Sequence, residues 1–310
     1  MGDRATPLAV ALAVDGAFGE IGRDWHPVAL VGHLLEKAYR PWRGRGPRVE
    51  LAGGAAALAG VGALAALVGW RAERLARHST GRRIWRALVA GILLKQAFSL
   101  RSLLDEGSGV ADALEGGRLD EARLRLRALV SRSTEALSPE LCASAAVESL
   151  AENLADSIAG PLLYYALLGF PAAAAYRVVN TADAMFGYHG ETEWLGKAAA
   201  RIDDVLSWAP SRLSALALMG AALLGRDPWS AGSAWRTWRR EGGRTASPNA
   251  GRPMAAMAGA LARRLEKPGH YVLGDGLPQP GPADVRAAVR LAGIAAALLA
   301  AAALLCPVRR

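Results

Sequence analysis

Cysteine is nearly absent from this sequence, and so are the short patterns by which many soluble enzymes bind metals and cofactors. Cys142 and Cys306 are the two cysteines, and both lie in apolar stretches, which excludes a disulfide framework and a cysteine-based metal site. The chain has no Walker A loop, no zinc-type His/Cys spacing and no serine nucleophile elbow. The segment "GVGALA" at residues 60–65 resembles a dinucleotide fingerprint, but no strand precedes it. We interpret its small residues as a surface for close helix packing.

Lysine is also scarce, so arginine carries most of the positive charge. The chain has 37 Lys and Arg residues and a net charge of +9, but its only lysines are Lys37, Lys95, Lys197 and Lys267. No basic–aromatic module typical of nucleic-acid-binding proteins accompanies this charge. The basic residues lie beside apolar runs, which favours anionic lipid over nucleic acid as their partner.

Long apolar runs are what the sequence does contain. Residues 51–70 are uncharged and would form a helix about 30 Å long, which matches the hydrocarbon core of a bilayer. Residues 289–306 form a second apolar run, residues 205–225 form a third with Pro210 and Arg212 near its start, and partial runs occupy 5–18, 84–104 and 157–179. We therefore expect an all-α, multi-pass integral membrane protein with about four or five spans. Residues 5–18 lack a positive n-region, so we expect them to be retained.

Two regions are more polar than the rest, residues 105–135 and 226–287. The first has apolar positions at helical spacing with charge on the other face. The second is rich in Pro and Gly, so we expect much of it to be loop. We predict one membrane-embedded domain over residues 1–310, with these regions in the cytoplasm. Both flanks of 51–70 are basic, so the positive-inside rule does not give its orientation.

Three acids recur at intervals of four in "VESLAENLADSIAG", residues 147–160. Helical geometry would place Glu148, Glu152 and Asp156 on one face. One interpretation is a soluble amphipathic helix with an acidic outer face. The other is a polar cavity in which carboxylates hold a divalent cation or pair with arginine. No Lys or Arg occurs from 133 to 176, which favours the cavity, since an exposed helix usually interleaves basic residues.

Three further stretches of the sequence contain polar residues that could belong to a binding site. Residues 177–204 combine Arg and Lys, which bind phosphate, with Asp, which binds metal. Local ion pairs on a solvated helix would explain that stretch equally well. "SPNAG" at 247–251 is a turn signal. His26 follows a Gly-rich segment, and a lone histidine there is more often structural than catalytic.

Together and in this order, these stretches resemble the CobD/CbiB family of membrane adenosylcobinamide-phosphate synthases of cobalamin biosynthesis. The most specific pieces are "VESLAEN" (147–153), "NTADAMFGY" (180–188), "AARIDD" (199–204) and "SPNAG". The resemblance implies a multi-pass enzyme that attaches aminopropanol O-phosphate, or a related amino alcohol, to the free carboxylate of adenosylcobyric acid. ATP drives that amide bond, with Mg²⁺ as the implied cofactor.

The resemblance also implies roles for particular residues. It gives catalytic roles to Glu148, Glu152, Asp183 and Arg201. It gives substrate and phosphate binding to His26, Arg132, Arg177, Asn180, Thr181, Lys197, Ser247 and Asn249. It gives metal binding to Glu148, Glu152, Asp156, Asp203 and Asp204.

The implied partners are the corrinoid, the amino-alcohol phosphate, ATP, membrane lipid and other corrin-pathway membrane enzymes, but no nucleic acid. The implied location is the inner cell membrane, with the active face in the cytoplasm. The chain departs from the family's usual residues at Ser133, Ser207, Thr245 and Met254. Two alternatives are a transporter or channel with an acidic cation path and a non-catalytic membrane sensor like the AmpE proteins.

Overall fold

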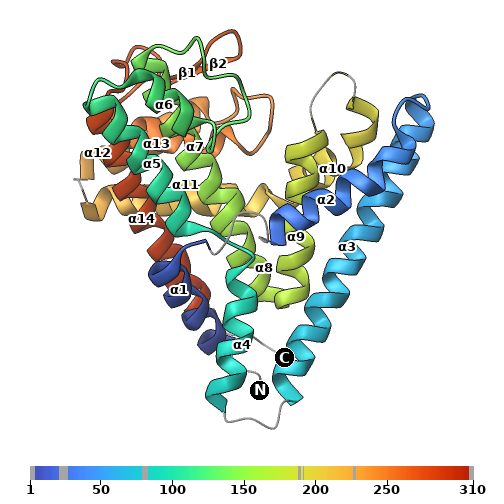
Figure 1. Cartoon of the computed structure of the whole chain (residues 1–310). Helices are drawn as coiled ribbons and strands as arrows, with labels where there is room; N and C mark the ends of the chain where they lie inside the picture. Colours follow the sequence, from blue (N-terminus) through green and yellow to red (C-terminus); the bar gives the residue numbers. More distant parts are fainter. Residues whose placement is uncertain are drawn as a thin grey trace. The chain divides into compact units, whose positions relative to one another are not determined.

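The structure, a computed structural model, describes residues 4–20, 27–78, 83–187, 190, 192–225 and 228–306. Within these residues it is almost entirely helical, as predicted, and its one sheet is a two-stranded hairpin (Figure 1). The chain divides into two compact units. Unit 1 comprises residues 1–99, 160–207 and 302–310, and unit 2 comprises residues 100–159 and 208–301. The prediction of one domain over the whole chain stays a prediction.

Unit 1 is organised around a long helix that packs against four others. Its core contains Leu35, Leu58, Phe186 and Leu195, and the ring of Tyr39 stacks on Phe186 with 4.4 Å between centroids. Its elements are α1 (Ala5–Phe18), α2 (Pro27–Tyr39), the 3₁₀ turn η1 (Arg40–Trp42), α3 (Pro47–His78), α4 (Arg83–Lys95), α8 (Gly160–Leu168), α9 (Phe170–Phe186) and α10 (Glu193–Leu206). The long helix is α3, and it packs against α2, α4, α9 and α10.

Two glycines let the backbones in unit 1 approach closely. A Cβ at Gly54 of α3 would fall on the carbonyl oxygen of Leu195, and one at Gly69 would lie 3.1 Å from the Cα of Pro171. By contrast, Gly60 and Gly62 have nothing within 4 Å of such a Cβ. Our interpretation of "GVGALA" as a packing surface therefore does not hold for its two glycines, whereas Val61 and Ala65 of the same stretch lie in or against the core of unit 1.

Unit 2 surrounds one fully buried helix. Every residue of α13 except Arg252 is buried, and the helix packs against α7, α11 and α12. The elements of the unit are α5 (Leu100–Glu115), α6 (Leu119–Leu126), α7 (Pro139–Asn153), the π-helical turn η2 (Leu154–Ala159), α11 (Trp208–Gly225), α12 (Pro228–Glu241), α13 (Gly251–Leu261), β1 (Leu265–Lys267), β2 (Tyr271–Leu273) and α14 (Pro282–Leu305).

The region 226–287 is more regular than the sequence predicted. It contains α12, α13 and an antiparallel hairpin in which Lys267 pairs with Tyr271. The expectation of loop was wrong for 228–241 and 251–261, whereas the stretches 242–250 and 274–281, which contain Pro248, Pro278 and Pro280, are turns and loops as expected. Pro228 and Pro282 are the first residues of α12 and α14, a position that needs no backbone N–H.

Two helices are long and apolar enough to cross a membrane among the residues described, within Pro47–Arg74 and Pro282–Leu305. A third would be Trp85–Lys95 together with Leu100–Glu115, if that pair forms one broken span. The predicted count of four or five is not confirmed. The run at 205–225 is helical as α11, but Pro210 and Arg212 lie in its first turns and half of its residues are buried within unit 2.

Candidate functional site

Glu148 of α7 is a buried carboxylate with three partners. It accepts hydrogen bonds from Ser144 Oγ at 2.6 Å and from the hydroxyl of Tyr271 at 2.8 Å, and Arg132 Nη2 lies 3.4 Å from its Oε2. Burial raises the pKa of Glu148, while Ser144, Arg132 and Tyr271 oppose that shift. A buried carboxylate is costly unless it is paired and hydrogen-bonded, and this one is both.

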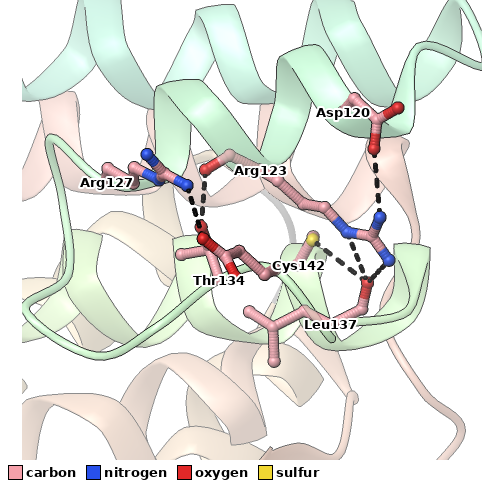
Figure 2. A network of polar contacts seen from close by, with 7 residues as sticks. Asp120, Arg123, Arg127, Thr134, Leu137 and Cys142 are labelled. Carbon is pink, nitrogen blue, oxygen red and sulfur yellow. Dashed lines mark hydrogen bonds and ion pairs between the residues drawn. The ribbon is translucent and has the colours of Figure 1, made fainter.

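The cation of this cluster comes from the loop between α6 and α7. Arg123 donates from Nε and Nη2 to the Leu137 carbonyl oxygen at 3.0 and 2.8 Å, and Thr134 donates to the Arg123 carbonyl at 2.9 Å (Figure 2). These bonds hold the loop that carries Arg132. Its Nε and Nη1 atoms are buried without a hydrogen-bond partner, so two donor nitrogens of the guanidinium remain for an anion.

The hairpin supplies Tyr271, which the sequence did not identify as a site residue. Burial and the Glu148 carboxylate raise the pKa of Tyr271, so the phenol stays protonated and donates. The charge of Glu152 acts in the same direction, which places that acid near the same ring. No spacing signal points to this contact, because 123 residues separate Tyr271 from Glu148.

The three acids of 147–160 do not share one regular helical face. The helix α7 ends at Asn153, and Asp156 lies in the π-helical turn that follows. That turn has a wider hydrogen-bonding step than the α-helix, so the rotation assumed for Asp156 does not apply. Among the residues described, no group of three His, Cys, Asp or Glu side chains could hold a metal. The acids are therefore not gathered into one carboxylate cage.

The "SPNAG" turn forms a second cluster in unit 2. Ser247 Oγ accepts from the backbone N–H groups of Asn249 and Ala250, which fixes the entry into α13. Asn249 is buried, and its Oδ1 accepts from Arg212 Nη1 at 3.0 Å. Burial, followed by the charge of Arg252, lowers the pKa of Arg212. Two arginines thus lie at the start of a helix, a location suited to an anion, and neither was predicted.

Asp203 of α10 is the centre of a polar cluster in unit 1. Its Oδ2 accepts from Ser207 Oγ at 3.1 Å, and its Oδ1 lies 3.5 Å from Asn180 Nδ2. Ser207 also shares a hydrogen bond with the Tyr176 hydroxyl at 3.2 Å. Arg177 Nη1 donates to Asn180 Oδ1 at 3.3 Å. Burial raises the pKa of Asp203 to about 6, against the hydrogen bonds from Ser207 and Asn180.

The remaining predicted residues lie in varied surroundings. Arg201 is exposed and pairs with Asp204 at 3.7 Å. Lys197 pairs with Glu193 at 3.4 Å and lies over the Trp194 ring. Asp183 and Thr181 are half-buried on α9, and His26 lies outside the described residues. That Glu152 and Asp156 share a cavity with Asn180 and Asp203 stays a prediction, since the two pairs belong to different units.

Three of the four departures lie within these clusters. Ser207 donates to Asp203 where the family usually has Asn, so a donor is retained. The sulfur of Met254 accepts from the Tyr271 hydroxyl at 3.7 Å. Thr245 Oγ1 accepts from the Gly251 N–H and donates to the Ser247 carbonyl, which braces the turn. Ser133 is exposed, and nothing in the structure explains that change.

The oxygen ligands around Asp203 suit Mg²⁺ in kind. Magnesium is usually bound by one or two carboxylates, with water and substrate phosphate as its other ligands. The residues described place no cationic side chain against Asp203, which leaves a buried negative charge balanced only by neutral donors. Asp203 therefore fits a magnesium ligand better than Glu148 does, because Arg132 already pairs with Glu148. Asp204, the neighbour of Asp203 in sequence, pairs with Arg201.

Comparisons with known proteins agree on one family. The sequence model of the family described as "CobD/Cbib protein" matches residues 8–298. The cobalamin biosynthesis protein CobD of Dehalococcoides mccartyi is 40% identical over 86% of this chain and 85% of its own length. A probable CobD of Methanothrix thermoacetophila is 35% identical over 95% of both chains, and the CobD of Chromobacterium violaceum is 38% identical over 92% of this chain and 90% of its own. No solved structure matches.

Proposed function

The chain belongs to the CobD/CbiB family, and from this premise we propose that it is an ATP-dependent amide ligase of cobalamin biosynthesis. It joins (R)-1-aminopropan-2-ol O-phosphate, or a related amino alcohol, to the free carboxylate of adenosylcobyric acid. The product is adenosylcobinamide phosphate. The observation that carries the proposal is the Arg132–Glu148–Tyr271 cluster, in which the buried Glu148 belongs to "VESLAEN", one of the four stretches most specific to the family.

The reaction needs activation because a free carboxylate has a poor leaving group. In the first step a corrinoid carboxylate oxygen attacks the γ-phosphorus of ATP, and ADP leaves. In the second step the amine attacks the resulting acyl phosphate, the amine loses a proton, and inorganic phosphate leaves. Such a reaction depends on positioning and on neutralising phosphate charge more than on covalent chemistry with the protein.

The two clusters of unit 2 supply what the phosphates need. Arg132 has two buried guanidinium nitrogens without protein partners. Arg212 and Arg252 lie at the start of α13 beside Asn249. Arginine is well suited to phosphate because its planar group offers several donors in fixed geometry. We assign Arg132, Arg212 and Arg252 together to binding the phosphate groups of ATP and of the amino-alcohol phosphate.

The acids have two separate roles in this proposal. Glu148 holds Arg132 and Tyr271 in place, and we assign catalytic roles to Glu152 and to Asp183. Asp203 and Asp204 would hold Mg²⁺, which when bound neutralises phosphate charge. We place the protein in the inner cell membrane with this face in the cytoplasm, where ATP is available.

The test is ligation by purified protein in detergent. Adenosylcobyric acid, aminopropanol phosphate, ATP and Mg²⁺ are supplied together and then with each omitted in turn. We expect adenosylcobinamide phosphate by mass spectrometry and one ADP per product, with neither formed when ATP is omitted. Monodisperse protein that binds the corrinoid but forms no product would contradict the ligase and favour a sensor.

A further inference from the structure

Unit 1 contains a pocket whose apolar wall has no role in the proposed chemistry, although Arg177 and Thr181, which the resemblance assigns to substrate binding, are among its lining residues. Its volume is about 260 Å³, and it lies among α2, α3, α9 and the segment that follows α4. Apolar side chains make most of its wall, including Val31, Leu34, Val61 and Leu64. Its polar lining comes from Gln96, Arg177 and Thr181. Such a wall offers an apolar ligand burial but few hydrogen bonds.

The pocket follows the part of α3 that is suited to lie in a membrane. Its lining residues on this helix run from Val61 to Gly69, which spans about 12 Å along the axis at 1.5 Å per residue. One leaflet of a bilayer has about 15 Å of hydrocarbon. Two of these residues, Leu64 and Val68, are 48% and 58% exposed. With α3 as a membrane span, the open side of the pocket faces lipid tails.

A basic aromatic site follows the pocket directly along α3. The guanidinium carbons of Arg71 and Arg74 lie 5.8 and 5.2 Å from the ring centroid of Trp70. All three residues are exposed. Tryptophan is enriched at the membrane interface, and arginines there attract anionic lipid. The chain thus places positive charge at one end of an apolar pocket whose length is close to that of one leaflet.

We propose that this pocket holds one acyl chain of an anionic phospholipid whose head group is bound by Arg71 and Arg74. The guanidinium of Arg177 donates to Asn180, and its methylene stem can line an apolar wall. The acyl chain contacts Val61, Leu64 and Val68 on α3 and Ala174 on α9. The occupant is a membrane lipid, and the proposal requires α3 to span the bilayer.

The test uses the full chain in vesicles of phosphatidylethanolamine and phosphatidylglycerol. A trace of phosphatidylglycerol carries a photoreactive group at the middle of one acyl chain, and cross-linked peptides are mapped by mass spectrometry. We expect labelling to concentrate in residues 28–34, 61–69 and 170–174. Uniform labelling around α3 would overturn the proposal, since it would show only ordinary solvation by lipid.

Filling the pocket gives the matched comparison. Ala65 lines it, whereas Ala63 is exposed on the same helix and does not. We expect Ala65→Phe to lower retained phosphatidylglycerol, counted by native mass spectrometry, by at least about tenfold, because two or more methylenes lose their site. Ala63→Phe should retain the wild-type amount. Ala174→Phe repeats the test from α9 in case Ala65→Phe disturbs folding, and unchanged retention in both variants would refute the pocket.

The head-group site is tested separately. Arg71→Gln with Arg74→Gln should remove the preference for phosphatidylglycerol over phosphatidylcholine while leaving acyl cross-links at 61–69. An unchanged preference would show that these arginines do not bind the head group. Ligation activity is a separate measurement, so a failure here leaves the proposed ligase unaffected.

Discussion

Glu148 and Asp203 are both buried carboxylates, but their surroundings stabilise the charge in different ways. Glu148 has a cation, Arg132, and two hydroxyl donors. Asp203 has only the neutral donors Ser207 and Asn180 among the described residues. A buried charge without a cationic partner is costly. The surroundings of Asp203 therefore suit a carboxylate that binds a cation, whereas those of Glu148 suit a carboxylate that positions Arg132 and Tyr271.

The lack of a cationic partner at Asp203 should be visible in how the free energy of unfolding depends on pH. Burial raises its pKa from 3.8 to about 6, so between these values the folded protein holds a proton that the unfolded chain has lost. The ionisation of Asp203 therefore lowers the free energy of unfolding as pH rises from 3.8 to about 6, and this destabilisation stays constant at higher pH. We expect Asp203→Asn to stabilise the protein by about 3 kcal/mol at pH 7 while ligation is lost.

Thermal unfolding in detergent at pH 4.5 and pH 7.5 measures this effect. Taking the difference between variant and wild type removes the other titrating acids. The stabilisation should be small at the lower pH and larger at the higher one. Equal effects at both values, or a less stable variant, would contradict a raised pKa at Asp203.

Glu152 carries the prediction about chemistry. It follows Glu148 by one turn of α7 and is half-buried near Tyr271. Glu152→Gln keeps its size and hydrogen bonding but removes its charge. We expect ligation to fall by at least about 10²-fold, as on losing one strong transition-state contact, with unchanged unfolding temperature. The control is Glu135→Gln, whose carboxylate is 78% exposed and pairs with Arg127. Near-normal ligation by Glu152→Gln would contradict the catalytic role proposed for Glu152.

Two glycines of the helix α3 have opposite surroundings: Gly54 is in close contact with α10, and Gly60 has open space around it. A Cβ at Gly54 would overlap the Leu195 carbonyl of α10, while one at Gly60 meets open space. We expect Gly54→Ala to destabilise unit 1 by about 1–3 kcal/mol through overpacking. Gly60→Ala should stabilise it by about 0.5–1 kcal/mol, since glycine is a poor helix former. Denaturant unfolding of the two variants gives the comparison, and equal effects would mean that α3 and α10 do not pack as described.

The sequence predicted elements best where composition alone decides them. The run at 51–70 falls within α3, and the run at 289–306 coincides with the end of α14 except for Cys306; both helices have few buried residues for their length. Hydropathy does not distinguish a lipid-facing helix from one buried in protein. The helix α11 packs against α12 and α13. This packing within unit 2 explains its apolar side chains, which from hydropathy alone had suggested a membrane span.

Sites followed the same rule. The motif residues Asn180 and Asp203 were predicted and do lie together, because they are on adjacent helices of unit 1. The turn predicted at 247–251 is confirmed, whereas the substrate-binding roles of Ser247 and Asn249, which rest on the family resemblance, stay predictions. Tyr271 and Arg212 were missed because their contacts depend on tertiary packing across a hairpin and between helices. No local periodicity encodes such contacts.

At the scale of the whole molecule, the proposed reaction fixes the side of the membrane. ATP is cytoplasmic, so the face bearing Arg132, Asn249 and the hairpin should be cytoplasmic as well. His270 is exposed in the hairpin turn, which makes it a better reporter than the native cysteines, since Cys142 is buried and Cys306 is half-buried. A Cys306→Ser background leaves His270→Cys as the only accessible thiol among the described residues.

We expect a membrane-impermeant maleimide to label His270→Cys in opened membranes but not in intact cells. The physical reason is that the charged reagent does not cross the hydrocarbon core, so only thiols on the outer side react in intact cells. The matched control is the Cys306→Ser background alone, which should stay unlabelled in both samples because Cys142 is buried. A cytoplasmic marker protein with an exposed thiol reports whether the cells were intact. Labelling of His270→Cys in intact cells would put the hairpin outside, away from ATP, and would rule out the orientation and with it the ATP-dependent reaction.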